Sequence, residues 1–148
     1  MLLPACCCMG PGDLLFLFFD CYCIMTKSEK KIIIAVTGAS GSVYASKLIE
    51  KLGSLKEPGV TIAVVFSDTA LEIWEHETGS RFSAKPPVTL YKNNNFNAPF
   101  ASGSSYWDTM IVCPASMGTL GRIANGVSDD LICRAADVML KEKRRLIL

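Results

Sequence analysis

The chain alternates short apolar runs with segments in which apolar residues recur every three or four positions. The runs at 32–36, 61–66 and 109–113 are almost wholly apolar, as expected for parallel strands that are covered on both faces. A helical period of about 3.6 residues appears instead at 45–52 and 129–144. Strands that alternate with helices predict an α/β fold with a parallel sheet in a three-layer arrangement.

Weaker signals complete this outline. Ser67-Asp68 is expected to cap a helix that ends at Thr78-Gly79, and a short strand is expected at 88–91. The rest of 80–105 reads as loop, and a long loop in a compact α/β unit is usually functional or disordered. A further strand is expected to begin at 145–148.

The first strand runs into a turn of small residues, from Gly38 to Ser42, that opens the first helix. Gly38 and Gly41 let the turn bend and let a ligand approach the backbone. Ser40 adds a hydroxyl, and Ser42 is the expected helix N-cap. Backbone N–H groups and the helix dipole at such a turn suit a phosphate, so we predict a phosphate-bearing ligand here. A structural turn without a ligand is the alternative.

The fingerprint of a dinucleotide site is incomplete at this turn. Tyr44 stands near the position of the third glycine, and the second strand ends in Phe66-Ser67 instead of an acidic residue. A nicotinamide cofactor is therefore disfavoured. Ser67 and the small-residue turn 114–119 also follow strands, and ligands in such folds bind at the carboxyl ends of strands. Hydroxyls and amides with few carboxylates suit a phosphate-bearing ligand and do not suit a metal.

Composition narrows the classes of function. The 148 residues are expected to form one domain, and an apolar fraction of 50% is ample for a core. A net charge of +1 gives no electrostatic signature of nucleic-acid binding. His76 is the sole histidine, so neither a Ser-His-Asp triad nor a metal site is expected. Cys113 and Cys133 lie in the globular part, where we expect buried free thiols.

Residues 1–24 differ in composition from the rest. They hold five of the seven cysteines and the apolar run 14–19. That run is too short to span a bilayer, and it lacks the basic flank and clear cleavage site of a signal peptide. We expect an extension outside the fold, a domain at 25–148, and a cytoplasmic protein without membrane association. A membrane anchor or an acylated cysteine cluster is the alternative.

Two cations in the last helical segment, Arg134 and Lys141, lie seven residues apart and therefore share a face of the helix. Together they suit a second phosphate group. Asp137 lies between them, however, and from the residues alone a surface ion-pair ladder is the favoured interpretation.

Four sequence blocks, taken in order, resemble the UbiX-type flavin prenyltransferases, a family once described as phenylacrylic or hydroxybenzoate decarboxylase subunits. The blocks are Thr37–Gly41, Asn97–Ser105, Cys113–Leu120 and Arg134–Glu142. The resemblance extends from Lys31 to Leu148. It implies a flavodoxin-like or Rossmann-like fold that assembles into a homo-oligomer, typically a dodecamer.

The resemblance also implies an activity and a cofactor. A dimethylallyl group is transferred from a prenyl phosphate, dimethylallyl phosphate, to reduced FMN, and no metal takes part. The product, prenylated FMN, serves a UbiD-type decarboxylase. A non-catalytic FMN-binding subunit and a related flavin-dependent decarboxylase are the alternatives, and Met117-Gly118 after Pro114-Ala115-Ser116 speaks against the decarboxylase.

By position, the resemblance assigns FMN contacts to three turns and to one cation: Gly38, Ala39, Ser40, Ser67, Ser116, Met117, Gly118, Thr119 and Arg134. Ser40 is implied as a catalytic residue beside the reactive flavin nitrogen. Arg134 and Lys141 are implied as catalytic residues that hold phosphate and stabilise the leaving group, which reverses the ion-pair interpretation. The family's proton-handling glutamate falls just past Leu148, so we expect a C-terminally truncated domain with impaired activity.

Overall fold

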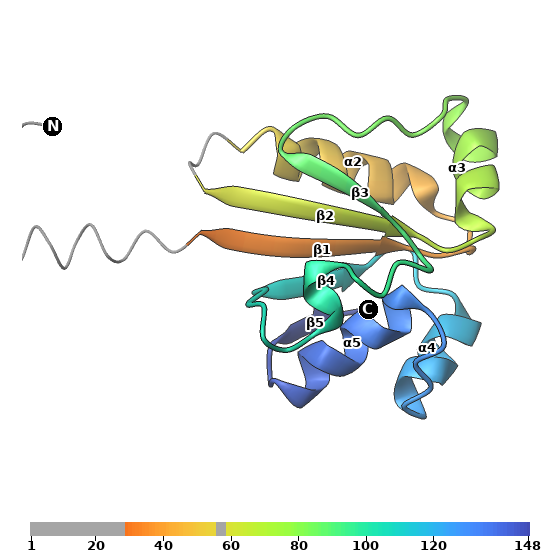
Figure 1. Cartoon of the computed structure of the whole chain (residues 1–148). Helices are drawn as coiled ribbons and strands as arrows, with labels where there is room; N and C mark the ends of the chain where they lie inside the picture. The colour runs from red at the N-terminus through yellow and green to blue at the C-terminus, as the bar shows by residue number, and fades with distance from the viewer. Residues whose placement is uncertain (1–28, 56–58) are drawn as a thin grey trace, which may run out of the picture.

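The computed structural model describes residues 29–55 and 59–148. Its centre is a five-stranded, wholly parallel sheet with the order β3-β2-β1-β4-β5 (Figure 1). The strands are β1 (Lys30–Val36), β2 (Val60–Phe66), β3 (Val88–Lys92), β4 (Thr109–Val112) and β5 (Arg145–Ile147). The strands expected from the apolar runs, and the short strands expected near residues 88 and 145, are therefore confirmed.

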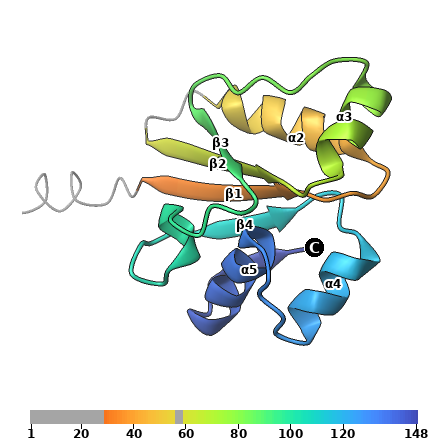
Figure 2. The same cartoon turned by 45° about the vertical axis from the view of Figure 1, so that its right-hand side comes forward.

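Helices cover both faces of the sheet. α2 (Ser42–Gly53) and α3 (Ala70–Thr78) lie on one face, and α4 (Met117–Ala124) and α5 (Leu131–Lys141) lie on the other (Figures 1 and 2). The three-layer arrangement is confirmed. Of the flavodoxin-like and Rossmann-like topologies, the observed strand order is that of the first five strands of a Rossmann sheet.

The apolar character of the central strands follows from this double coverage. Successive side chains of a strand point to opposite faces, so Ile33 and Ala35 pack with α4 and α5, whereas Ile34 and Val36 pack with α2 and α3. All four of these side chains are fully buried. A one-sided sheet would have required polar residues at alternate positions.

The long connection before β4 is more ordered than the sequence pattern predicts. Its second half contains a short 3₁₀ helix (Pro99–Ala101) whose Phe100 is buried between Tyr91 and Trp107, with ring centroids about 5 Å apart. The carbonyl of Asn93 accepts from the amide of Leu131 at 2.8 Å, at the start of α5. This part of the loop is thus an element of the core.

Three helices have boundaries that differ from the expected ones. Gly41, with φ of +124°, precedes α2 as its N-cap, so Ser42 is the first helical residue and the expectation that Ser42 caps the helix was wrong. Thr69 takes the N-cap position of α3 that we expected at Ser67-Asp68.

The expected helix at 129–144 is shorter, because Asp130 caps its start and the chain turns at its end. There Lys143 has a positive φ of 54°, and the amide of Arg144 donates to the carbonyl of Met139 at 2.8 Å. A left-handed residue with such a backward bond is the usual way in which a helix ends.

Strand order also shows where a ligand would bind. β1 lies between β2 and β4, and the chain leaves the carboxyl end of β1 towards one side and that of β4 towards the other. In open α/β sheets, ligands bind in the crevice outside the strand ends at such a switch point.

The extension expected at residues 1–24 lies outside the described residues. Among those that are described, no helix is long and apolar enough to cross a bilayer.

Candidate functional site

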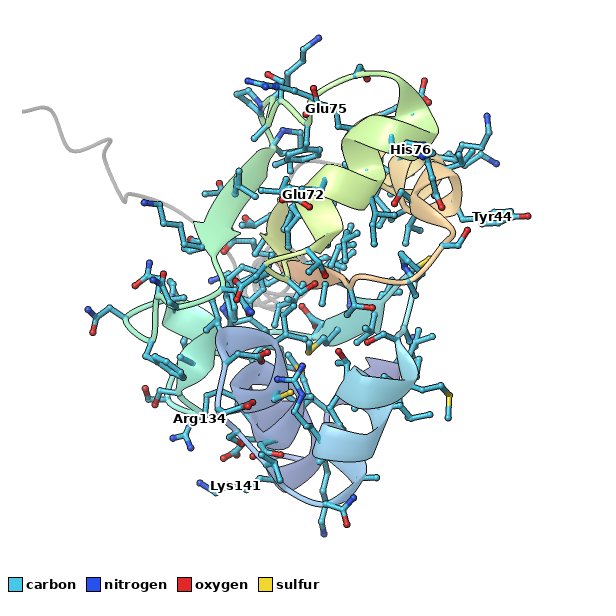
Figure 3. All side chains as sticks on the ribbon, turned by 90° about the vertical axis from the view of Figure 1, so that its right-hand side faces the viewer. Tyr44, Glu72, Glu75, His76, Arg134 and Lys141 are labelled. Atoms are coloured by element: carbon cyan, nitrogen blue, oxygen red, sulfur yellow. The ribbon has the colours of Figure 1, made fainter. Side chains whose placement is uncertain are left out.

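Three serine-bearing turns meet at the carboxyl edge of the sheet. The amide of Ser67 donates to the carbonyl of Val36 at 2.9 Å, and the amide of Ser116 donates to Thr37 Oγ1 at 2.7 Å. Ser40 follows Thr37 by three residues in the same turn. The prediction that residues after β1, β2 and β4 share one edge is therefore confirmed, and Figure 3 views the molecule from this edge.

Thr37 joins two of these turns. Its side chain is 1% exposed, its hydroxyl donates to the carbonyl of Pro114 at 2.6 Å, and it accepts from the amide of Ser116. The sequence pattern marks Thr37 only as part of a motif. The available signal was a polar residue directly after an apolar strand, and its partners lie more than 70 positions away in the chain.

A carboxylate of the chain itself occupies the glycine turn. Glu77, at the end of α3, accepts from Ser40 Oγ at 2.7 Å, from the amide of Gly41 at 3.0 Å and from the amide of Ser42 at 2.7 Å. The hydrogen bonds from Ser40, Gly41 and Ser42 lower the pKa of Glu77 below its ordinary value. The anion at these two amides is thus a side chain where we expected a phosphate, because α3 brings its last turn against the start of α2.

Gly38 is required by its surroundings. A Cβ at this position would collide with Thr69 Oγ1, and nearby side-chain atoms of Thr69 and Ile73 close the remaining space. The glycine therefore lets the turn after β1 pack closely against the start of α3.

The hydroxyl of Ser67 is a buried polar group at the strand ends that a ligand would satisfy. Its Oγ is buried and, like Ser42 Oγ and Trp107 Nε1, it has no hydrogen-bond partner among the described residues. A buried polar atom without a partner costs free energy, and a ligand with a donor or acceptor at the strand ends would remove that cost.

The start of α4 offers unpaired amides. Ser116 caps this helix: its Oγ accepts from the amide of Thr119 at 3.2 Å and donates to Thr119 Oγ1 at 3.0 Å. The first amides of a helix have no acceptor within the helix, so those of Met117 and Gly118 remain available at the positive end of the helix dipole. This pattern suits an anionic group.

Asp129, Asp130 and Cys133 lie close enough together to suggest a metal site. Their contacts are instead ion pairs and a helix cap. Arg122 pairs with both carboxylates at 2.9 Å, and Asp130 also accepts from the amide of Cys133 at 2.7 Å as the cap of α5. Burial, together with the charge of Asp130, raises the pKa of Cys133 to about 12.

Cys113 and Cys133, the cysteines of the described residues, differ in burial. Cys133 is buried and free, as expected. Cys113 is free but only partly buried, and burial raises the pKa of its thiol.

Arg134 and Lys141 share a face of α5, as expected, but they lie apart from the serine turns (Figure 3). They line a cleft of about 480 Å³ together with Ser102, Gly103 and Asp137, and none of the three strand-end serines lines it. Arg134 Nε donates to the carbonyl of Ala101 at 3.2 Å.

The ion-pair ladder along this face is absent among the described residues, so that interpretation was wrong. Asp137 accepts a hydrogen bond from Ser128 and makes no ion pair with either cation. Lys141 Nζ lies 3.6 Å from Glu142 instead. Arg134 therefore has no ion pair among the described residues, whereas an anion from outside the chain would compete with Glu142 for Lys141.

Comparison with known proteins agrees with this geometry. A family model described as "Flavoprotein" matches residues 24–148. A flavin prenyltransferase UbiX of Methanocaldococcus jannaschii is 41% identical over 120 residues, which are 80% of this chain and 63% of that protein. The chain thus spans less than two thirds of the length of this relative.

Solved structures show the same similarity. The structure of AnUbiX (PadA1) in complex with FMN and dimethylallyl pyrophosphate matches with a TM-score of 0.68 and 38% identity, over 81% of this chain and 63% of that one. A dodecameric FMN-dependent Ubix-like decarboxylase from Escherichia coli O157:H7 matches with a TM-score of 0.69 and 36% identity, over 78% of this chain and 63% of that one. The chain belongs to the Flavoprotein family, and its resemblance to the UbiX-type members is confirmed.

Proposed function

We propose that this protein binds FMN at the strand-end edge and transfers a dimethylallyl group from a prenyl phosphate to the reduced flavin. The product, prenylated FMN, would serve a UbiD-type decarboxylase in the cytoplasm. The observation that carries the proposal is the convergence of the Ser40, Ser67 and Ser116 turns on one edge, where Ser67 Oγ is buried and has no partner within residues 29–55 and 59–148.

The donors at this edge fit a phosphorylated flavin. The unpaired amides of Met117 and Gly118 suit its phosphate, because they combine two N–H groups with the helix dipole. Ser67 would supply a hydroxyl to the ligand, and Gly38 and Ala39 would border it. The amides of Gly41 and Ser42 are excluded as phosphate donors since Glu77 already holds them.

Ser40 has a defined orientation. Its hydroxyl proton is directed at Glu77, so the lone pairs of Ser40 Oγ are left for a ligand. An acceptor here suits an N–H group, which the reduced isoalloxazine ring supplies. Ionised Glu77 keeps the hydroxyl in this orientation over the neutral pH range, because its pKa is lowered.

Arg134 and Lys141 are proposed to hold the phosphate of the prenyl donor and to stabilise it as it leaves. They line a separate cleft of the chain, so this role requires a homo-oligomer in which the cleft of one copy lies against the strand-end edge of another. The dodecameric relative from Escherichia coli supports such an assembly.

The test has two steps. Quenching of flavin fluorescence on titration with FMN measures binding, and variants Ser67→Ala and Ser40→Ala are expected to weaken it. Anaerobic incubation with reduced FMN and dimethylallyl phosphate, followed by mass analysis of the flavin, measures transfer. If the titration shows that FMN does not bind, the proposed site is refuted.

A non-catalytic FMN-binding subunit is the second candidate, and the separation of Arg134 and Lys141 from the serine turns favours it. Binding of FMN without any prenylated product, in protein shown by light scattering to be oligomeric, would select this candidate. Formation of product that is lost in Arg134→Ala and Lys141→Ala would select the enzyme.

A further inference from the structure

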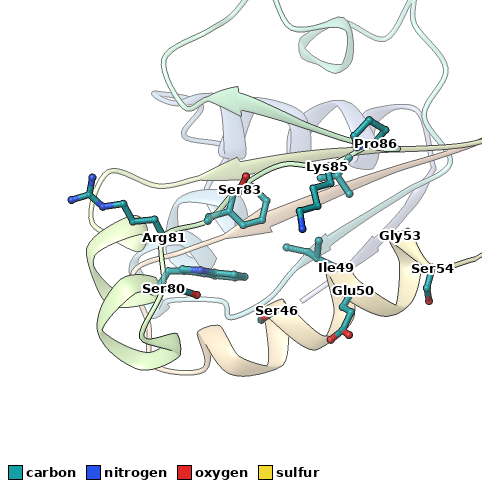
Figure 4. Close-up of a pocket in the computed structure, with 13 residues that line it drawn as sticks. Ser46, Ile49, Glu50, Gly53, Ser54, Ser80, Arg81, Ser83, Lys85 and Pro86 are labelled. Atoms are coloured by element: carbon teal, nitrogen blue, oxygen red, sulfur yellow. The ribbon is translucent and has the colours of Figure 1, made fainter.

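We infer a second ligand site, separate from the strand-end edge, that takes a small organic anion with an apolar body and one negatively charged group. It is a cavity of about 550 Å³ between α2, α3 and the segment 80–86 (Figure 4). A volume of this size lies within the range of pockets that bind small molecules.

The floor of the cavity is apolar. Ile49 of α2 and Trp74 of α3 are 7% and 5% exposed, and the ring of Phe82 packs edge-on against Trp74 with a centroid distance of 5.3 Å. Val88 of β3 also lines the cavity. Aromatic and aliphatic side chains that are held in place by a packed core give an apolar ligand a preformed surface.

The rim carries hydroxyls, the exposed carboxylate of Glu50 and two cations. Of the two cations that line the cavity, Arg81 is paired with Glu75 at 3.2 Å. Lys85 has no ion pair within residues 29–55 and 59–148. Figure 4 shows Lys85 extending from the 80–86 segment towards Ile49, over the floor, while Glu50 is directed away from it.

These features select the chemical class of the ligand. An ammonium group above an apolar floor attracts an anion whose body can bury against that floor, and the serine hydroxyls of the rim can complete its hydrogen bonds. A neutral apolar molecule would gain nothing from the ammonium group of Lys85, and a polyanion would meet the carboxylate of Glu50 and only one cation without an ion pair. The site shares no lining residue with the serine turns or with the Arg134 cleft, so ligands at the two places should bind independently.

The experiment uses the full chain and two probes of the same shape, naphthalene-2-sulfonate and uncharged 2-naphthalenemethanol. Isothermal titration is carried out with and without saturating FMN. We expect saturable, one-to-one binding of the sulfonate that FMN does not displace, and weaker binding of the alcohol. Lys85→Gln should weaken sulfonate binding about threefold to fivefold, the effect expected for a partly solvated charge pair.

Two further variants separate this site from general surface binding. Ser46→Phe places a ring in the cavity from α2 and should abolish binding of both probes. Lys47→Gln removes a neighbouring exposed cation of α2 that does not line the cavity. This variant should bind both probes as the unmodified protein does. Absence of saturable binding, displacement by FMN, or equal affinity in Lys85→Gln and the unmodified protein would each overturn the inference.

Discussion

Replacement of Thr37 by valine tests the contact that joins the β1 and β4 turns. Valine keeps the branched shape of threonine but removes the hydroxyl that donates to Pro114 and accepts from Ser116. Because the side chain is 1% exposed, water cannot readily take the place of the hydroxyl.

The magnitude follows from the bonds that are lost. The carbonyl of Pro114 keeps its bond from the amide of Thr37 at 3.3 Å, so loss of the hydroxyl bond there costs about 1 kcal/mol. The amide of Ser116 loses its acceptor, which costs about 1–3 kcal/mol. We therefore expect Thr37→Val to lower the free energy of unfolding by about 2–4 kcal/mol. At about 4 °C per kcal/mol, Tm falls by about 8–16 °C.

Thr37→Ser is the matched control, since it keeps the hydroxyl and loses one methyl group, worth about 1 kcal/mol. Urea denaturation monitored by circular dichroism measures both variants, and FMN titration at a temperature where both are folded measures the site. Valine should weaken FMN binding more than serine does. If the two variants are equally destabilised, or if valine changes the free energy of unfolding by less than about 0.5 kcal/mol, the hydroxyl does not join the turns as described.

Three other perturbations address neighbouring contacts. Gly38→Ala should destabilise the protein because its Cβ meets Thr69 Oγ1, and adding Thr69→Ala should restore much of the loss in thermal melts; no recovery would contradict this close contact. Because its pKa is lowered in the fold, ionised Glu77 stabilises the protein at pH values above 4.5, the ordinary pKa of this group. The contribution disappears as the pH falls through the lowered pKa of the folded state. Stability should therefore decline with acid less steeply in Glu77→Gln, and parallel curves would argue against the role of the carboxylate. Asp130→Ala should cost about 1 kcal/mol through loss of the α5 cap, whereas Asp130→Asn, which can still accept from Cys133, should cost less in urea denaturation; equal losses would assign the effect to the ion pair with Arg122.

Residue patterns along the chain are enough to predict the helices and strands. Wholly apolar runs require coverage on both faces, and this fixed the central strands of a three-layer sheet. The end of α3 at Gly79, with its left-handed backbone, and the start of β5 also agreed with local signals. These features depend on residues that are neighbours in the chain, so periodicity and turn chemistry can reveal them.

The tertiary structure alone decided which groups meet. Thr37 bonds across 79 positions to Ser116, and Glu77 reaches back across 36 positions to Gly41. The strand order brings the first pair together, and the packing of α3 against α2 brings the second. No local sequence pattern predicts either contact. The sequence therefore indicated that an anion would bind the glycine turn, but not that this anion is the carboxylate of Glu77. Likewise, the shared face of Arg134 and Lys141 followed from helical spacing, whereas their separation from the serine turns followed from where α5 lies on the sheet.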